Sequence, residues 1–161
     1  MLFLKEEIRM SFIENQQLCY DNVLSYRTRI SESSLPELIS FVRENIDAMD
    51  LSITGDIIFS ISERITDDDV SIIGVEFIIP VDKRFKSSSR YVFKPRFKLE
   101  NAVMYKFSGD IMKLSRESSR LYEYVIRKNM KAVTEIYYCV KRLDGSNSVI
   151  CMYIGTNGNL L

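Results

Sequence analysis

The stretch from residue 98 to 153 constrains the fold most, because its residue pattern changes period twice. Apolar residues alternate with polar ones up to Phe107, and helical spacing then runs from 111 to about 129. Two further alternating segments meet at the sequence DGSN of residues 144–147, which is typical of a tight turn. The stretch therefore predicts the order strand, helix, strand, strand.

The same order of strand, helix, strand, strand is predicted for the residues that precede this stretch. Alternation over 22–30 predicts a strand, and Ser34 with Pro36 predicts a helix start. Alternation over 53–63 and the apolar run 70–81 predict two more strands. The predicted helix carries one apolar stripe, which consists of Leu35, Leu38, Ile39, Val42, Ile46 and Met49.

We therefore predict an α+β fold in which tandem pseudo-duplicated β-α-β-β units form an antiparallel sheet. Both helices should cover one face, and the opposite face should be concave. Residues 1–161 form one domain, with repeat one at about 20–81, a linker at about 82–98 and repeat two at about 99–154. The linker's basic, serine-rich start (82–90) predicts a mobile connection, and Pro95 predicts an edge segment. Residues 1–19 predict only a short helix or strand at the domain edge.

Composition narrows the classes of partner. Apolar residues make up 46% of the chain and charged residues 27%, which is ordinary for a globular protein. Because 22 basic residues balance 22 acidic ones, we expect no direct nucleic-acid partner. No apolar run approaches the ~18 residues of a membrane span, so we expect no membrane partner. The first ten residues, MLFLKEEIRM, are too short in apolar content for a signal peptide, which predicts a cytoplasmic protein.

Residue types also restrict the chemistry. The chain has no histidine, and its three cysteines (Cys19, Cys139 and Cys151) form no CxxC motif. Histidine-based triads and zinc sites are therefore disfavoured, and we predict no metal, no cofactor and no catalytic residue. Cys139 and Cys151 should lie nearly opposite each other across the 144–147 turn, where packing is the expected role. An enzyme, if this were one, would depend on carboxylates, lysines or tyrosines.

Glu135 is the first candidate site residue. Alternation places Glu135, Tyr137 and Cys139 on one face of a strand, and the residues between them on the face that suits a helix-covered core. The first set should therefore look toward the concave face. A carboxylate there could bind a cation or, with a raised pKa, act as acid or base. The alternative is an exposed glutamate near the strand start.

Glu76 is the second candidate, because it interrupts a nearly continuous apolar strand. Its alternatives are a pocket carboxylate and a cross-strand partner of arginine or lysine. Tyr105, Tyr137 and Tyr153 are the candidate pocket aromatics, and the alternative for each of them is core packing.

Short segments on these elements resemble the GyrI-like, effector-binding domain superfamily. The segments are GDIIF at 55–59, GVEFIIPV at 74–81, FSGDI at 107–111, LYEYVI at 121–126 and EIY at 135–137. The resemblance covers about residues 20–154. It implies a small-molecule pocket between two repeats, with a glutamate at its floor that Glu135 matches and aromatic residues around it.

Some positions depart from that family's pattern. Asp110-Ile111 stands where the family commonly has Pro-Tyr, and the helix lacks the frequent tryptophan. No helix-turn-helix precedes the domain, so we expect a stand-alone member. The leading hypothesis is a domain that binds a hydrophobic or cationic organic ligand. The alternative is a protein-interaction module resembling gyrase-inhibitory proteins, and a carboxylate-dependent hydrolase ranks third.

Overall fold

The computed structural model describes residues 12–159, which form six strands and two α-helices. The elements are β1 (Phe12–Ser31), α2 (Leu35–Ala48), β2 (Ile57–Asp67), β3 (Val70–Pro80), β4 (Tyr91–Gly109), α3 (Leu114–Arg127), β5 (Met130–Arg142) and β6 (Ser148–Asn159). The predicted α+β class is confirmed, and the order β-α-β-β occurs twice. That order does not establish a duplication, which stays a prediction. Of the segment predicted at 1–19, residues 1–11 lie outside the described part, and the rest begins β1.

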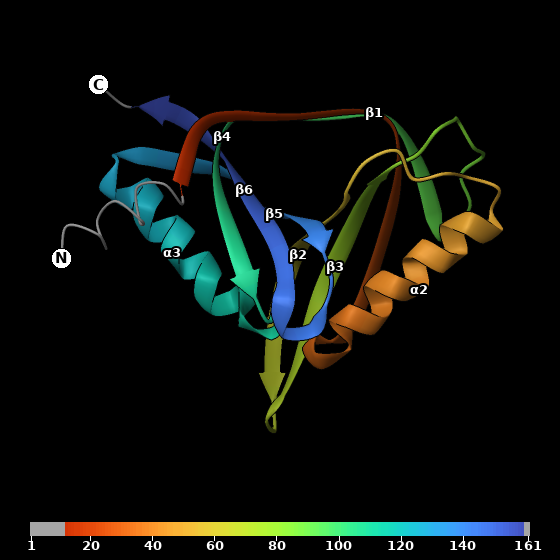
Figure 1. Ribbon diagram of the computed structural model, residues 1–161, viewed down its shortest axis with the longest axis horizontal. Helices are drawn as coiled ribbons and strands as arrows, with labels where there is room; N and C mark the ends of the chain where they lie inside the picture. Colours follow the sequence, from red (N-terminus) through yellow and green to blue (C-terminus); the bar gives the residue numbers. More distant parts are fainter. Residues whose placement is uncertain (1–11, 160–161) are drawn as a thin grey trace.

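The sheet closes on itself. Its strand order is β1-β3-β2-β5-β6-β4, every pairing is antiparallel, and β4 pairs back onto β1. Figure 1 shows β1 and β4 crossing the top of the view, with α3 and α2 on the two flanks. The predicted concave face opposite the helices is the inner face of a closed barrel, and this closure was not predicted.

Closure depends on the length of β1 and β4, which have 20 and 19 residues. β1 has positive φ angles of 59° at Asn15 and 57° at Asn22, and β4 has 50° at Asn101. Asparagine adopts this left-handed conformation more readily than most residues, so it can interrupt a strand's regular alternation. The register between β1 and β4 shifts between residues 13 and 18 of β1. These interruptions let one pair of strands contribute to both sides of the barrel.

The prediction of an edge segment around Pro95 is confirmed for residues 91–98 of β4, which have a neighbouring strand on one side only. β6 pairs only with residues 102–109 of β4, so residues 91–98 have β1 as their one neighbouring strand. A proline, which has no N–H to donate, is tolerated at such a position. The preceding loop, predicted to be mobile, is fastened to this strand. The Phe93 N–H donates to Ser87 Oγ at 2.9 Å, and the Ser88 N–H donates to the Tyr91 carbonyl at 2.8 Å.

Two clusters fill the two faces of the sheet. The helix-facing cluster joins α2 and α3 to apolar residues of every strand, including Phe59 and Phe77. The inner cluster contains buried Leu18, Val23, Ile58, Ile78, Leu99, Ala102, Cys139 and Cys151, with Tyr20, Phe97, Met104, Tyr137 and Tyr153 packed against them. No helix in residues 12–159 has both the length and the apolar character needed to cross a bilayer.

The alternation predicted for β5 is confirmed. Ile136, Tyr138 and Val140 belong to the helix-facing cluster, and Cys139 and Tyr137 belong to the inner one. Cys139 also lies directly opposite Cys151 on β6, as predicted, and both thiols are free.

Candidate functional site

A row of directly paired residues crosses all six strands on the face opposite the helices. Directly opposite residues in an antiparallel pair project to the same side, so the members of the row are neighbours. From β1 round to β4, the row is Arg27, Glu76, Ser60, Tyr137, Tyr153 and Met104. Three of the five predicted site residues therefore lie in one row.

Glu135 lies two positions before Tyr137 on β5, and its side chain is exposed. It lines a surface cavity of about 390 Å³ together with Glu76. The lining residues are Arg27, Thr28, Arg29, Ser62, Glu63, Gly74, Val75, Glu76 and Glu135. No arginine or lysine in residues 12–157 forms an ion pair with Glu135, whereas Glu63 is held by Arg29 at 2.6 Å. The Glu135 carboxylate therefore remains available to a ligand.

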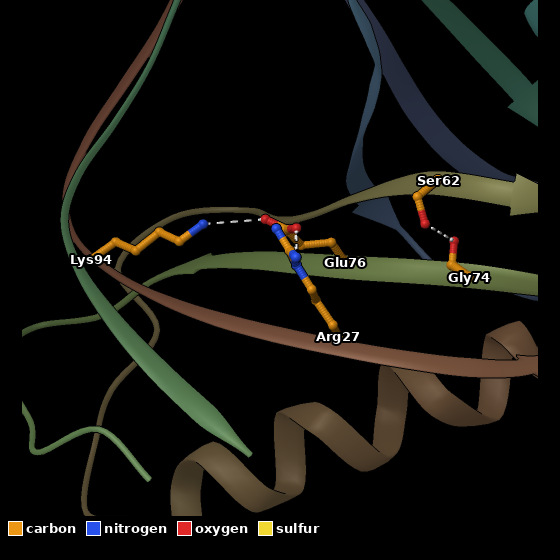
Figure 2. Close-up of polar contacts among 5 residues, drawn as sticks. All are labelled: Arg27, Ser62, Gly74, Glu76 and Lys94. Carbon is orange, nitrogen blue, oxygen red and sulfur yellow. Dashed lines mark hydrogen bonds and ion pairs between the residues drawn. The ribbon is translucent and has the colours of Figure 1, made fainter. Parts of the chain in front are cut away.

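Glu76 is paired on both of its oxygens. Arg27 Nε lies 2.5 Å from Oε2, and Lys94 Nζ lies 3.4 Å from Oε1. Figure 2 shows the two cations reaching Glu76 from β1 and β4. The glutamate side chain is only 16% exposed, but the Arg27 side chain is 76% exposed. The cross-strand partner predicted as one alternative for Glu76 is therefore present.

Gly74 allows β2 and β3 to come close beside this cavity. A β-carbon at position 74 would lie 2.8 Å from Ser62 Oγ, which is too close, and 3.0 Å from Glu63 Cγ, which is a tight contact. The Ser62 hydroxyl donates to the Gly74 carbonyl at 3.4 Å, as drawn in Figure 2. The register of the two strands also shifts between Ile61 and Glu63. The irregularity therefore turns Glu63 toward the cavity wall.

The hydroxyl of Tyr137 lies in a negative environment. Burial is the main cause that raises its pKa, and the carboxylates of Glu135 and Glu76 raise the pKa further. The tyrosine is therefore a neutral hydrogen-bond donor at physiological pH. Burial likewise raises the pKa of Tyr153 to about 12. Glu135, Glu76 and Tyr137 thus form one connected electrostatic group.

Tyr105 is not brought together with the other four predicted residues. It belongs to the helix-facing cluster, where its hydroxyl donates to Glu117 Oε2 at 2.6 Å. Its ring stacks on Phe12, with centroids 4.8 Å apart. The alternative given for each tyrosine, core packing, describes its position.

Sequence reasoning did not identify Arg27 or Lys94. A signal for Arg27 was present, because the arginine alternates with the apolar residues of its strand and falls on the same face as Ser25. Lys94 carried no such signal, since its approach to Glu76 depends on how β4 pairs with β1.

The sequence and the structure were each compared with those of known proteins. No family model and no curated protein matches the sequence. The structure is similar to EcmrR in a complex with DNA, with a TM-score of 0.75 and 16% identity over 98% of this chain and 62% of that chain. It is also similar to the EcmrR C-terminal domain, with a TM-score of 0.66 and 15% identity over 91% of this chain and 98% of that chain.

A hydrolase from Listeria innocua is similar at a TM-score of 0.53 and 9% identity, over 96% of this chain and 98% of that chain. This chain spans 62% of the length of EcmrR as it is seen in the DNA complex. Identities this low show a shared fold. The chain has the fold of the EcmrR C-terminal domain, which is consistent with the GyrI-like domain that its sequence resembles.

Proposed function

We propose that the chain binds a small organic cation at the cavity between Glu135 and Glu76. The observation that carries the proposal is a surface cavity of about 390 Å³ whose lining includes Glu76 and the Glu135 carboxylate, which forms no ion pair within residues 12–157. That volume lies within the range of small-molecule sites, which is roughly 300–1,000 Å³. The fold shared with the EcmrR C-terminal domain, and the pocket that the sequence resemblance implies, support the same function.

Charge favours a cation over an anion. The lining holds three glutamates and two arginines, which leaves one carboxylate in excess. Arg29 pairs with Glu63, and Glu76 pairs with Arg27 and with Lys94, which lies outside the lining. The lining carboxylate that forms no ion pair within residues 12–157 is therefore Glu135. A ligand cation in the cavity would be attracted by the Glu135 carboxylate.

The ligand should sit at the mouth of the barrel rather than deep inside it. Phe97 of β4 contacts Tyr137 across the interior, with ring centroids 5.1 Å apart. Neither ring is among the residues that line the cavity, and Val75 supplies the apolar side chain of its lining. The proposed ligand therefore combines a cationic group with a modest apolar part.

Thermal unfolding with benzyltrimethylammonium tests the proposal, with neutral benzyl alcohol as the comparator. Saturating cation, at about 100 times its Kd, should stabilise the wild type by about 2.7 kcal/mol. For a chain of this size, that stabilisation raises the Tm by roughly 5–10 °C. Glu135→Gln should lose most of the shift. The matched control is Glu44→Gln, at an exposed position on α2, which should keep it. Equal shifts with benzyl alcohol, or an unchanged shift in Glu135→Gln, would refute a cation site.

A second candidate function, a protein-interaction module, has one specific observation in its favour. The Phe97–Tyr137 contact occupies the interior, as expected of a domain whose pocket is filled by its own side chains. The resemblance to gyrase-inhibitory proteins suggests purified DNA gyrase as the partner to test. Co-elution on size-exclusion chromatography that is lost on changing Lys83, Arg84 and Lys86 to glutamine, but kept in Glu135→Gln, would favour this function. A carboxylate-dependent hydrolase has no specific observation in its favour within the described residues.

A further inference from the structure

A second cavity, separate from the Glu135 site, lies beside the loop that joins β3 to β4. Its volume is about 540 Å³, within the range of small-molecule sites. Its lining residues are Asn22, Arg84, Phe85, Lys86, Ser87, Phe93 and Pro95. It therefore shares no residue with the cavity at Glu135.

The loop is held in one shape by its own hydrogen bonds. Asp82 is tied to Ser52 by two of them, at 2.9 and 3.0 Å, and Ser87 Oγ accepts from the Phe93 N–H at 2.9 Å. The Phe85 and Phe93 rings meet edge to face, with centroids 5.4 Å apart. A ligand would meet walls that are already in place, which lowers the entropic cost of binding.

The charge of this cavity is positive. Arg84 and Lys86 are its charged lining residues, and the lining contains no carboxylate. Within residues 12–157 neither cation forms an ion pair, in contrast to the neighbouring Lys83, which pairs with Asp50 at 3.4 Å. The Arg84 guanidinium lies 5.5 Å from the centroid of the Phe93 ring, so that cation and ring share one wall. Two unpaired cations beside two rings fit a planar ligand that carries an acid group.

The cavity offers one surface for the aromatic ring of a ligand and another for its acid group. Phe85, Phe93 and Pro95 give apolar faces on which a flat ring can pack. Arg84 can hold a carboxylate or phosphate in a bidentate manner, Lys86 adds a second charge, and the Ser87 hydroxyl can still donate a hydrogen bond. We propose that this cavity binds a small aromatic anion, with the ring against Phe85 and Phe93 and the acid group on Arg84 and Lys86.

Isothermal titration with four probes tests the proposal: 1-naphthyl phosphate, 1-naphthoate, neutral 1-naphthol and inorganic phosphate. At least one naphthyl anion should bind with a Kd below about 1 mM, and both 1-naphthol and inorganic phosphate should bind at least about tenfold more weakly. Binding of one anion and not the other would assign the acid group. Equal binding of 1-naphthol or of inorganic phosphate would overturn the proposal, as would no binding of either naphthyl anion.

Substitutions of the lining residues test whether the naphthyl anion binds in this cavity. Arg84→Gln and Phe93→Leu should each weaken the bound naphthyl anion about tenfold or more, and Lys86→Gln gives a second charge variant if Arg84→Gln unfolds. Lys83→Gln is the matched control, because it removes the same charge from the same loop outside the cavity. Equal weakening in Lys83→Gln and Arg84→Gln would show general electrostatic attraction and would overturn the site. Glu135→Gln should leave this binding unchanged, so that failure here and failure of the cation site are separable.

Discussion

Phe97 and Tyr137 meet across the barrel interior at an interplanar angle of 66°, although β4 and β5 are not neighbouring strands. The contact joins the β1–β4 side of the barrel to the β2–β5 side.

Truncating the Phe97 side chain should leave a cavity in the barrel interior. We expect Phe97→Ala to lower the free energy of unfolding by about 3 kcal/mol, the lower end of the range for a phenylalanine, because this side chain is half-buried. Urea denaturation measures the change, and Phe41→Ala on α2, where the side chain is 47% exposed, is the control, with an expected effect near 0.5 kcal/mol. Equal losses in the two variants would mean that the Phe97–Tyr137 contact contributes little.

Removing the Tyr105 hydroxyl should affect stability and leave ligand binding alone. Tyr105→Phe leaves the buried Glu117 carboxylate without its 2.6 Å donor, with only Arg120 Nε nearby at 3.6 Å. The expected loss is about 1–2 kcal/mol in thermal or urea unfolding. Tyr122→Phe, at a position 42% exposed, should change stability little. A loss of benzyltrimethylammonium binding in Tyr105→Phe, with stability kept, would instead return Tyr105 to the site.

The three cysteines should differ in reactivity. Burial raises the pKa of Cys139 to about 12 and also raises the pKa of Cys151, so both stay protonated as well as inaccessible at pH 8. Cys19 is exposed. Ellman's reagent at pH 8 should therefore titrate one thiol quickly in the native protein and all three in guanidinium chloride. Rapid reaction of a second thiol without denaturant would contradict the buried placement.

Stability should fall in alkali. The folded pKa of Cys139, about 12, exceeds its unfolded value of 9.0, so the folded state binds the proton more tightly. The resulting stabilisation is complete below pH 9 and is lost as the pH rises toward 12, at a slope of up to about 1.4 kcal/mol per pH unit. Tyr153 and Tyr124, each raised to about 12 from 10.0, act in the same direction from pH 10.

Urea denaturation at pH 8 and pH 10.5 measures this loss of stability. Cys139→Ala should be less stable at pH 8 but should lose less between the two values than the wild type. An identical loss in both proteins would assign the alkaline sensitivity to the other groups with raised pKa values, which are Cys151 and the tyrosines.

Local alternation was enough to predict which way most strand residues face. On β5, the apolar set Ile136, Tyr138 and Val140 marked the helix-covered side, and the placement of Tyr137 followed. Applied strictly, the same rule would have placed Tyr105 correctly, since it shares its phase with Val103 and Phe107, both of which face the helices.

Closure of the barrel was beyond local patterning. Leu18, Tyr20 and Val23 all belong to the inner cluster, yet they do not keep a period of two, because Asn22 has a positive φ between them. Alternation therefore appears broken at the place where β1 changes direction, and only the pairing with β4 reveals a single strand. The ion pairs of Glu76 were equally hidden, since Lys94 reaches it through that long-range pairing.

The pairing of β1 with β4 also bears on how the chain is made. Synthesis runs from the N-terminus, so β1 exists before the strand that covers one of its edges. A nascent or truncated chain that ends before residue 91 would present that edge unpaired, and an unpaired strand edge invites pairing with another chain. The finished barrel gives each of the six described strands two neighbouring strands, so β4, which is made after β1, β2 and β3, protects the edge of β1 from aggregation.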